Sequence, residues 1–103
     1  MLFAFMLMDK PGVAHLRQQM RPVHKAYLAE VQECIAFAGP LVAGDGTTMM
    51  GSLLVSDFPS REAAYAWLAH EPFVQAAMFA SIKVRAFVNL WPQKPASRPE
   101  EWT

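Results

Sequence analysis

The first strand-like segment of this chain is apolar on both of its sides. Residues 2–8 read LFAFMLM, and the turn signal DKPG follows at residues 9–12. Short, aromatic-rich runs that end at such a turn are typical of β-strands. Because successive strand side chains point to opposite faces, no polar row is left for water, and we expect this strand to be covered on both sides. One face takes Leu2, Ala4, Met6 and Met8, and the other takes Phe3, Phe5 and Leu7.

The rest of the chain alternates between helical and strand-like patterns. Helical periodicity runs over residues 12–33 and resumes after Ser60, a good helix-capping residue, while strand patterns occupy 34–43, 50–58 and 79–90. The order is therefore strand, helix, strand, strand, helix, strand. It predicts an α+β fold, a ferredoxin-like βαββαβ protomer whose antiparallel four-stranded sheet carries both helices on one face.

Three prolines predict local breaks in these elements. We expect the first helix to end near Met20 and a second to begin near Pro22, because proline inside a helix removes a hydrogen bond. The Gly-Pro pair at 39–40 predicts a bulge or a sheet edge. Pro72 should end the preceding helix by His70 and can begin a further helical turn.

The length of 103 residues predicts one domain. We expect it to span residues 1–90, in the order given above. Residues 91–103 read WPQKPASRPEEWT, with three prolines and little periodicity, so we expect an extended C-terminal tail.

An excess of apolar residues bears on the oligomeric state. Hydrophobic residues make up 53% of the chain and charged residues only 17%, and two helices can cover only one face of the sheet. A second copy of the chain would cover the other face, with burial worth about 25 cal/mol per Å² of apolar surface. We therefore predict a homodimer packed sheet on sheet. The alternative is a monomer whose tail folds over the open face.

Several classes of protein and site are disfavoured. Nine basic and nine acidic residues give no basic excess for binding nucleic acid, and no apolar run is long enough to cross a membrane. Residues 1–12 lack the charged start of a signal peptide, and the single cysteine, Cys34, is expected to be a core thiol in a reducing, cytoplasmic setting. No metal-ligand spacing, phosphate loop, nucleophile elbow or dinucleotide motif is present, so we expect no metal and no cofactor.

A histidine shares the apolar stripe of the first long helical segment. His24 precedes Leu28 by four residues and Val31 by seven, so it should face the sheet with them. A polar ring in that position needs a hydrogen-bond partner. Spacing alone leaves two interpretations equally open, a core histidine bound to a backbone carbonyl and a functional imidazole. The apolar members of the stripe are Val23, Ala26, Tyr27, Leu28, Val31 and Cys34.

Two arginines and a serine are candidate substrate-binding residues. Arg17, Arg21 and His24 are spaced four and three apart, and would share one face if the helix continued through Pro22. Arginines near a helix start are disfavoured by the dipole and suited to meeting an anion, although solvated surface positions are the alternative. Ser52 has no base beside it in sequence, which favours a structural or substrate-binding serine over a nucleophile.

The segment HEPF at residues 70–73 supplies a candidate acid. Glu71 occupies the junction before Pro72, but glutamate is not a preferred helix cap, so its carboxylate can turn to a nearby cation. An imidazole paired with a carboxylate has a fixed tautomer, which suits proton transfer. We therefore consider His24 and Glu71 a candidate catalytic pair, a contact that sequence spacing neither requires nor excludes.

Four segments together resemble the YCII-related (YciI-like) proteins of the dimeric α+β barrel superfamily. They are LRQQMRPVHKAYL, AGPLVAGDG, GSLLV and EPFVQAAMFASIKVRAF, and the resemblance runs from Met1 to about Leu90. It implies a ferredoxin-like protomer, a dimer made by sheet packing and a cleft with a histidine–acid dyad. The histidine falls on His24. The family's acid is an aspartate before Pro-Phe or Pro-Tyr, and this sequence has Glu71 there, which keeps the charge and adds one methylene.

Three functions follow as hypotheses. The first is a cofactor-independent enzyme that uses His24 and Glu71 for elimination, isomerisation or dehydrochlorination of a small aromatic or anionic metabolite. The resemblance supports it, since one similar branch removes chloride from a hydroxylated aromatic and related barrels act on lactones. The second is a non-catalytic domain that binds a small ligand. The third is a structural dimerisation module.

Overall fold

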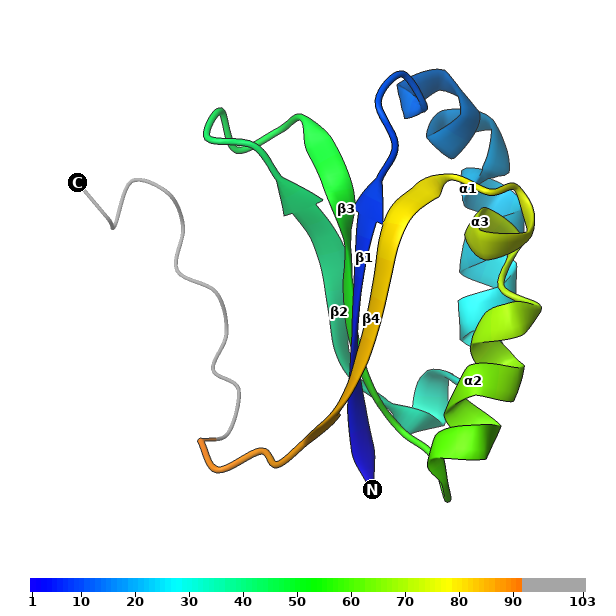
Figure 1. Cartoon of the computed structure of the whole chain (residues 1–103), viewed down its shortest axis with the longest axis vertical. Coiled ribbons are helices and arrows are strands. Elements are labelled where there is room, and N and C mark those ends of the chain that lie inside the picture. Colours follow the sequence, from blue (N-terminus) through cyan, green and yellow to red (C-terminus); the bar gives the residue numbers. More distant parts are fainter. Residues whose placement is uncertain (92–103) are drawn as a thin grey trace.

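The computed structural model describes residues 1–91, which form one four-stranded antiparallel sheet with its helices on one side (Figure 1). The strands lie in the order β2-β3-β1-β4, so β1 is a central strand between β3 and β4. This order and the single helical layer confirm the expected ferredoxin-like α+β fold. The elements are β1 (Leu2–Asp9), α1 (Ala14–Ala29), the 3-10 turn η1 (Gln32–Cys34), β2 (Ile35–Val42), β3 (Met49–Asp57), α2 (Arg61–Ala69), α3 (Pro72–Gln75) and β4 (Phe79–Phe87).

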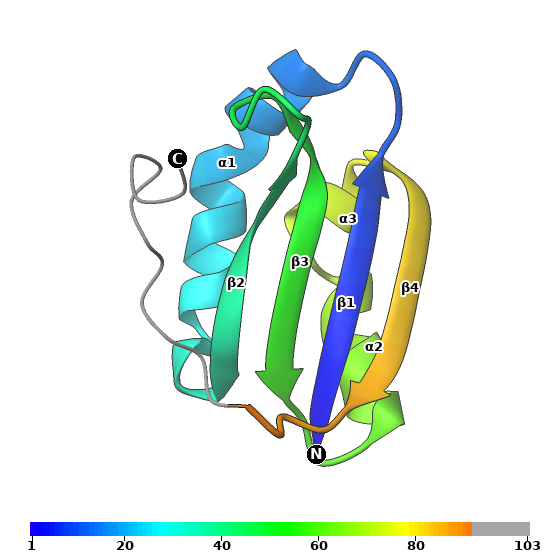
Figure 2. The same cartoon turned by 90° about the vertical axis from the view of Figure 1, so that its left-hand side faces the viewer.

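The strand register assigns each side chain to a face of the sheet. On β1, Phe5 is paired with Leu54 of β3 and Val84 of β4, and all three are buried beneath the helices. The next residue, Met6, is paired with Leu53 and Lys83 on the opposite face. Figure 2 looks directly onto that face, which none of the helices covers. The two-sided apolar character predicted for β1 therefore corresponds to one helix-covered face and one open face.

The hydrophobic core lies between the sheet and the helices. Phe5 forms an edge-to-face contact with Phe58, with ring centroids 5.9 Å apart, and Trp67 of α2 packs on both rings. Aromatic pairs of this kind add to the stabilisation that comes from burial. The buried members of the core are Phe3, Phe5, Leu7, Leu54, Phe58, Ala64, Leu68, Phe73, Met78, Phe79 and Val84.

Helix α1 is continuous, so the expected break at Pro22 is wrong. Pro22 lies inside the helix, which runs without interruption from Ala14 to Ala29. Proline removes the amide hydrogen that would bond the carbonyl of Gln18. Both Pro22 and Gln18 are exposed, so water can satisfy that carbonyl and the helix can continue.

The inner face of α1 differs from the expected stripe at three positions. Val23 is 54% exposed, Ala26 is exposed, and Cys34 is exposed in η1 and not a core thiol. His24, Tyr27 and Leu28 are half-buried, as expected for residues that face the sheet. The stripe therefore exists, but the 3-10 turn after α1 ends the helical phase before Cys34.

The remaining boundaries agree with the sequence patterns to within a few residues. Pro40 lies in β2, an edge strand with register shifts at both ends, as the Gly-Pro pair predicts. Strand β4 ends at Phe87, three residues before the expected end. Ser60 caps α2 by accepting the amide hydrogen of Ala63 at 3.1 Å. The predicted extended tail, residues 91–103, lies outside the described residues except for Trp91.

Candidate active site

A pocket of about 670 Å³ lies between α1 and the β2–β3 half of the sheet. Its floor includes Ala38 and Pro40, whose small side chains share the helix-covered face with Leu54 and leave space below α1. Arg17 is the one buried residue of α1. The helix therefore stands off this half of the sheet, and the gap is the pocket.

The structure brings His24 and Glu71 together in the wall of this pocket. The Nδ1 of His24 forms a hydrogen bond with the Oε1 of Glu71, whose side chain is only 2% exposed. The Oε2 of Glu71 accepts the amide hydrogen of Val74 at 3.1 Å and so caps α3. One carboxylate thus holds both a helix start and an imidazole, a double role that the sequence pattern treated as alternatives.

This pairing determines which ring nitrogen of His24 is available. An ionised carboxylate only accepts hydrogen bonds, so Nδ1 carries the proton and Nε2 presents its lone pair. Among residues 1–91, Nε2 has no hydrogen-bond partner, and His24 lines the pocket. The imidazole is therefore set up to take a proton from a ligand.

Phe73 fixes the plane of the imidazole. The two rings are stacked with their centroids 3.9 Å apart and an interplanar angle of 6°. Phe73 is itself only 1% exposed and meets Phe79 edge to face at 6.2 Å. A hydrogen bond to Nδ1 and a flat contact with a buried ring together leave the imidazole little freedom to rotate.

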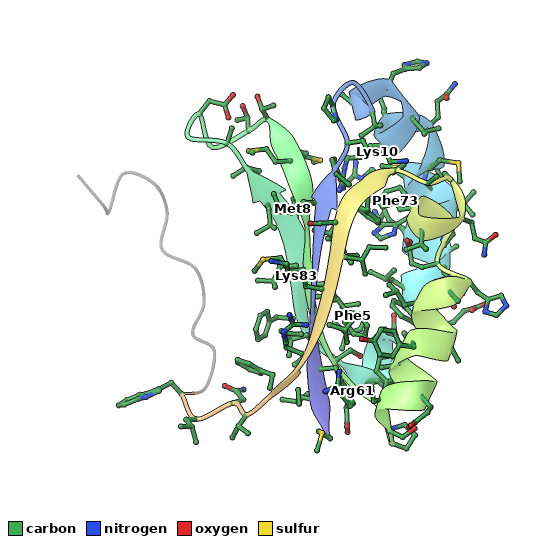
Figure 3. The ribbon with its side chains drawn as sticks, viewed as in Figure 1. Phe5, Met8, Lys10, Arg61, Phe73 and Lys83 are labelled. Atoms are coloured by element: carbon green, nitrogen blue, oxygen red, sulfur yellow. The ribbon has the colours of Figure 1, made fainter. Side chains whose placement is uncertain are left out.

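Figure 3 shows Phe73 and Phe5 between the sheet and the helices, with Met8 and Lys83 on the other side of the sheet.

Arg17 and Ser52 meet at the deep end of the pocket. The guanidinium of Arg17 donates to both carboxylate oxygens of Asp9 and to the Ser52 Oγ, each at 3.0 Å. The side chains of Arg17 and Asp9 are 10% and 7% exposed, so this is a largely buried, bidentate ion pair. The carboxylate of Asp9 therefore balances the charge of Arg17. The Cζ atom of Arg17 also lies 4.9 Å from the centroid of the Phe73 ring.

Two further cations line the pocket at its exposed rim. Arg21 and Lys25 lie four residues apart on α1, and the side chains of both are exposed. Within residues 1–91, neither has an acidic partner in salt-bridge range. The rim of the pocket is therefore positively charged, in contrast to the balanced deep end.

The turn between β2 and β3 forms part of the pocket wall. The Oδ1 of Asp45 accepts the amide hydrogens of Thr47 and Thr48 at 2.9 Å, and the hydroxyl of Thr48 donates to Oδ2. These bonds, led by those from Thr48, lower the pKa of Asp45 to about 2. Thr47 and Thr48 line the pocket, so Asp45 holds the turn in place.

A tyrosine ties α1 to α2 behind the pocket. The hydroxyl of Tyr27 donates to the carbonyl of Trp67, and the two rings stack at 5.1 Å. Burial, followed by the charges of Glu30 and Glu71, raises the pKa of Tyr27 above its usual value. The hydroxyl therefore keeps its proton and its bond to α2 at neutral pH.

All five residues selected from the sequence line this one pocket, and three contributors were missed. His24, Glu71, Arg17, Arg21 and Ser52 are all in its wall. Asp9 was interpreted only as part of a turn, and Phe73 only as part of a helix-start motif. Lys25 could have been found, because it continues the four-residue spacing of Arg17 and Arg21.

Residues 1–91 contain neither a cluster of metal-ligating side chains nor a membrane-spanning helix. They bring no three metal-ligating side chains (His, Cys, Asp or Glu) close enough to share an ion. None of the helices in this part of the chain has the length and hydropathy needed to span a bilayer.

Comparison with known proteins relates the chain to one family. The model of the YCII-related domain matches residues 1–88. Protein YciI of Escherichia coli O6:H1 is 31% identical over 98 residues, covering 88% of this chain and all of that protein. An uncharacterized protein of Haemophilus influenzae is 29% identical over 98 residues, with the same coverage.

A solved structure is similar in fold as well. It is the 5-chloro-2-hydroxyhydroquinone dehydrochlorinase TftG of Burkholderia phenoliruptrix in complex with 2,5-dihydroxybenzoquinone. The TM-score is 0.81 at 28% identity, over 85% of this chain and 94% of that one. The family match over nearly all of the described residues confirms the resemblance seen in the sequence: this chain belongs to the YCII-related family.

Proposed function

We propose that this protein is a cofactor-independent enzyme that moves a proton on a small ring compound. His24 is the general acid or base, and Glu71 orients it. The observation that carries the proposal is the contact of Nδ1 with a buried carboxylate, which leaves Nε2 available in a pocket of suitable size. A positioned imidazole of this kind contributes typically about 10²–10⁴-fold to a rate.

Elimination or isomerisation needs nothing beyond such a proton transfer. In an elimination, Nε2 takes a proton from the ring compound, and the electron pair released expels a leaving group such as chloride. Nε2 is then protonated, and it loses that proton to water, so no oxidant or reductant is consumed. The activity for which TftG is named, dehydrochlorination of a hydroxylated ring, belongs to this class and supports it for the present chain.

We also propose that the protein acts as a homodimer joined through the open faces of two sheets. Support comes from the apolar side chains that the register assigns to that face. Met6 is 45% exposed there, a large apolar side chain in the centre of a sheet. A second copy would remove this surface from water. A cytoplasmic location, inferred from the single cysteine, stays a prediction.

Turnover of a ring-compound panel tests the catalytic proposal. Chlorinated and hydroxylated aromatics are incubated with wild type, His24→Ala and Glu71→Gln, and chloride release and ring absorbance are followed. We expect His24→Ala to lower the rate by about 10²-fold or more. Glu71→Gln keeps an oxygen that can cap α3 but no longer offers a carboxylate to Nδ1, so it should slow the reaction while the fold survives.

The matched control is another histidine. His70→Ala removes an exposed imidazole at the end of α2, where its Nδ1 contacts the carbonyl of Ala66 at 3.0 Å, and it should leave turnover unchanged. Turnover that persists in His24→Ala would overturn the catalytic role. Binding of panel members without turnover by wild type would identify a non-catalytic ligand-binding domain.

A further inference from the structure

We propose that the ligand of this pocket is a single-ring compound with one carboxylate, which Arg21 and Lys25 bind at the rim. The inference deepens the proposed function, because it rests on His24 as the residue that meets the reacting end of the same ligand. It assigns to Lys25 a role in substrate recognition.

The charge distribution in the pocket carries the first step. Arg17 is neutralised by Asp9, and Glu71 is bound to His24 and the α3 amide. Arg21 and Lys25 are the cations of the pocket wall that lack an acidic partner among residues 1–91. Like charges four residues apart on a helix repel one another, and an anion placed between them relieves that repulsion. A guanidinium beside an ammonium suits a carboxylate in particular, because the planar fork binds both of its oxygens.

The helix spacing sets the size of the ligand. His24 is three residues after Arg21 and next to Lys25, and side chains three or four apart on a helix have Cβ atoms about 5–6 Å apart. The anion and the atom that meets Nε2 are therefore separated by roughly the width of one six-membered ring. Ala38 and Pro40 add apolar surface to the wall of the same pocket, which suits the ring.

The deep end of the pocket sets the charge of the ligand. A second carboxylate there would approach Arg17, whose guanidinium already binds Asp9 and Ser52. Among the pocket residues in the described part of the chain, no other cation is available at that end. The pocket should therefore prefer a monocarboxylate to a dicarboxylate.

Binding of a matched pair of compounds tests the inference. The affinities of 3-hydroxybenzoate and its neutral amide, 3-hydroxybenzamide, are measured by NMR titration with wild type, Arg21→Gln and Lys25→Gln. We expect wild type to bind the acid at least tenfold more tightly than the amide. Each substitution should weaken binding of the acid by three- to tenfold and leave the amide unaffected. Raising the ionic strength should also weaken binding of the acid but not of the amide, because the rim is exposed to solvent.

The control is Lys10→Gln, which removes an exposed cation outside the pocket wall and should change neither affinity. Equal binding of acid and amide would overturn the inference, as would an equal loss in Lys10→Gln or no binding of either compound at millimolar concentration. Charge-dependent binding with no His24-dependent turnover of any ring compound would uphold the inference and refute the catalytic proposal. If the protein turns over neutral ring compounds but does not bind the acid, the catalytic proposal is upheld and the inference about the carboxylate is refuted.

Discussion

The two faces of the sheet are built from similar apolar residues but have different surroundings. On β1, Phe3, Phe5 and Leu7 are 2%, 0% and 4% exposed beneath the helices, while Met6, between them in sequence, is 45% exposed on the open face. The covered side also holds buried polar groups, which include the Arg17–Asp9 pair, Ser56 and Glu71. The open face holds Lys83 and Arg85, which are exposed.

This difference separates two uses of apolar surface. Under the helices, a layer of large side chains supports one half of the sheet, and small residues in the other half leave a cavity with polar groups in its wall. On the open face, which no helix of the described part of the chain covers, the register places apolar side chains such as Met6 and Leu53 side by side. We propose a small ligand for the covered face and a second protein surface for the open face. The predictions below test this division, beginning with the largest effect.

Truncation in the core should cost far more than truncation on the open face. We expect Phe5→Ala to lower the free energy of unfolding by about 3–5 kcal/mol, because it leaves a cavity among buried rings. Met6→Ala should cost less than about 1 kcal/mol in the monomer, since its side chain is already half in water. Urea denaturation at a protein concentration that favours monomer measures both. Similar losses for the two variants would show that the faces are not distinct.

Loss of a buried cation should cost more than loss of an exposed one. Arg17→Ala leaves the Asp9 carboxylate buried without a partner, which we expect to cost about 3 kcal/mol of unfolding free energy. Arg85→Ala on the open face should cost less than about 0.5 kcal/mol. The double variant Asp9→Leu/Arg17→Met removes both charges and should recover most of the loss. Failure of that recovery would argue that the pair does more than balance charge.

A charge placed at the centre of the open face should separate the proposed dimer. Met6→Lys introduces an ammonium next to Lys83, and we expect it to weaken association by about 100-fold, or roughly 2.7 kcal/mol. Sedimentation equilibrium measures the shift. Tyr65→Lys on α2 is the matched control, because Tyr65 is 46% exposed on the helical side and should not affect association. A wild-type protein that is monomeric at all concentrations would contradict the interface.

Acid should break the hydrogen bonds of the β2–β3 turn before it destabilises the core. The folded state lowers the pKa of Asp45 to about 2, so its bonds are fully formed above its ordinary value of 3.8 and are lost as the pH falls towards 2. We expect the Thr47 and Thr48 amides to lose protection over that window, measured relative to their intrinsic exchange rates at each pH. Amide exchange followed by NMR measures this, and Asp45→Asn should remove the pH dependence. A turn that keeps its protection at pH 2 would show that Asp45 does not hold it.

Sequence patterns predicted the fold because they report on what each element faces. The alternation in β1 predicted both faces, and Pro40 predicted the edge. They could not predict how far α1 stands off the sheet, because this depends on Ala38 and Pro40 lying opposite it after folding. The break at Pro22 was wrong because its cost depends on whether water reaches the Gln18 carbonyl, which is a property of the folded surface.

The residues that line the candidate site could be selected from the sequence, but the contacts between them could not. His24 and Arg17 share a helix face that periodicity describes well, whereas the contact of His24 with Glu71 joins residues 47 positions apart. Asp9 was missed for a similar reason. It is the partner of Arg17 only because the turn after β1 brings the start of α1 back over the end of that strand.

The two bonds of Glu71 make a single turn of helix part of the proposed reaction centre. When α3 unwinds, the carboxylate that orients the imidazole loses its own anchor, so the rate reports on how often that turn is formed. Heat, denaturant or a weakened α3 should therefore switch the protein off well before the sheet melts. A glutamate side chain has one more rotatable bond than an aspartate, so Glu71→Asp should alter the local order of α3 and the proposed turnover together.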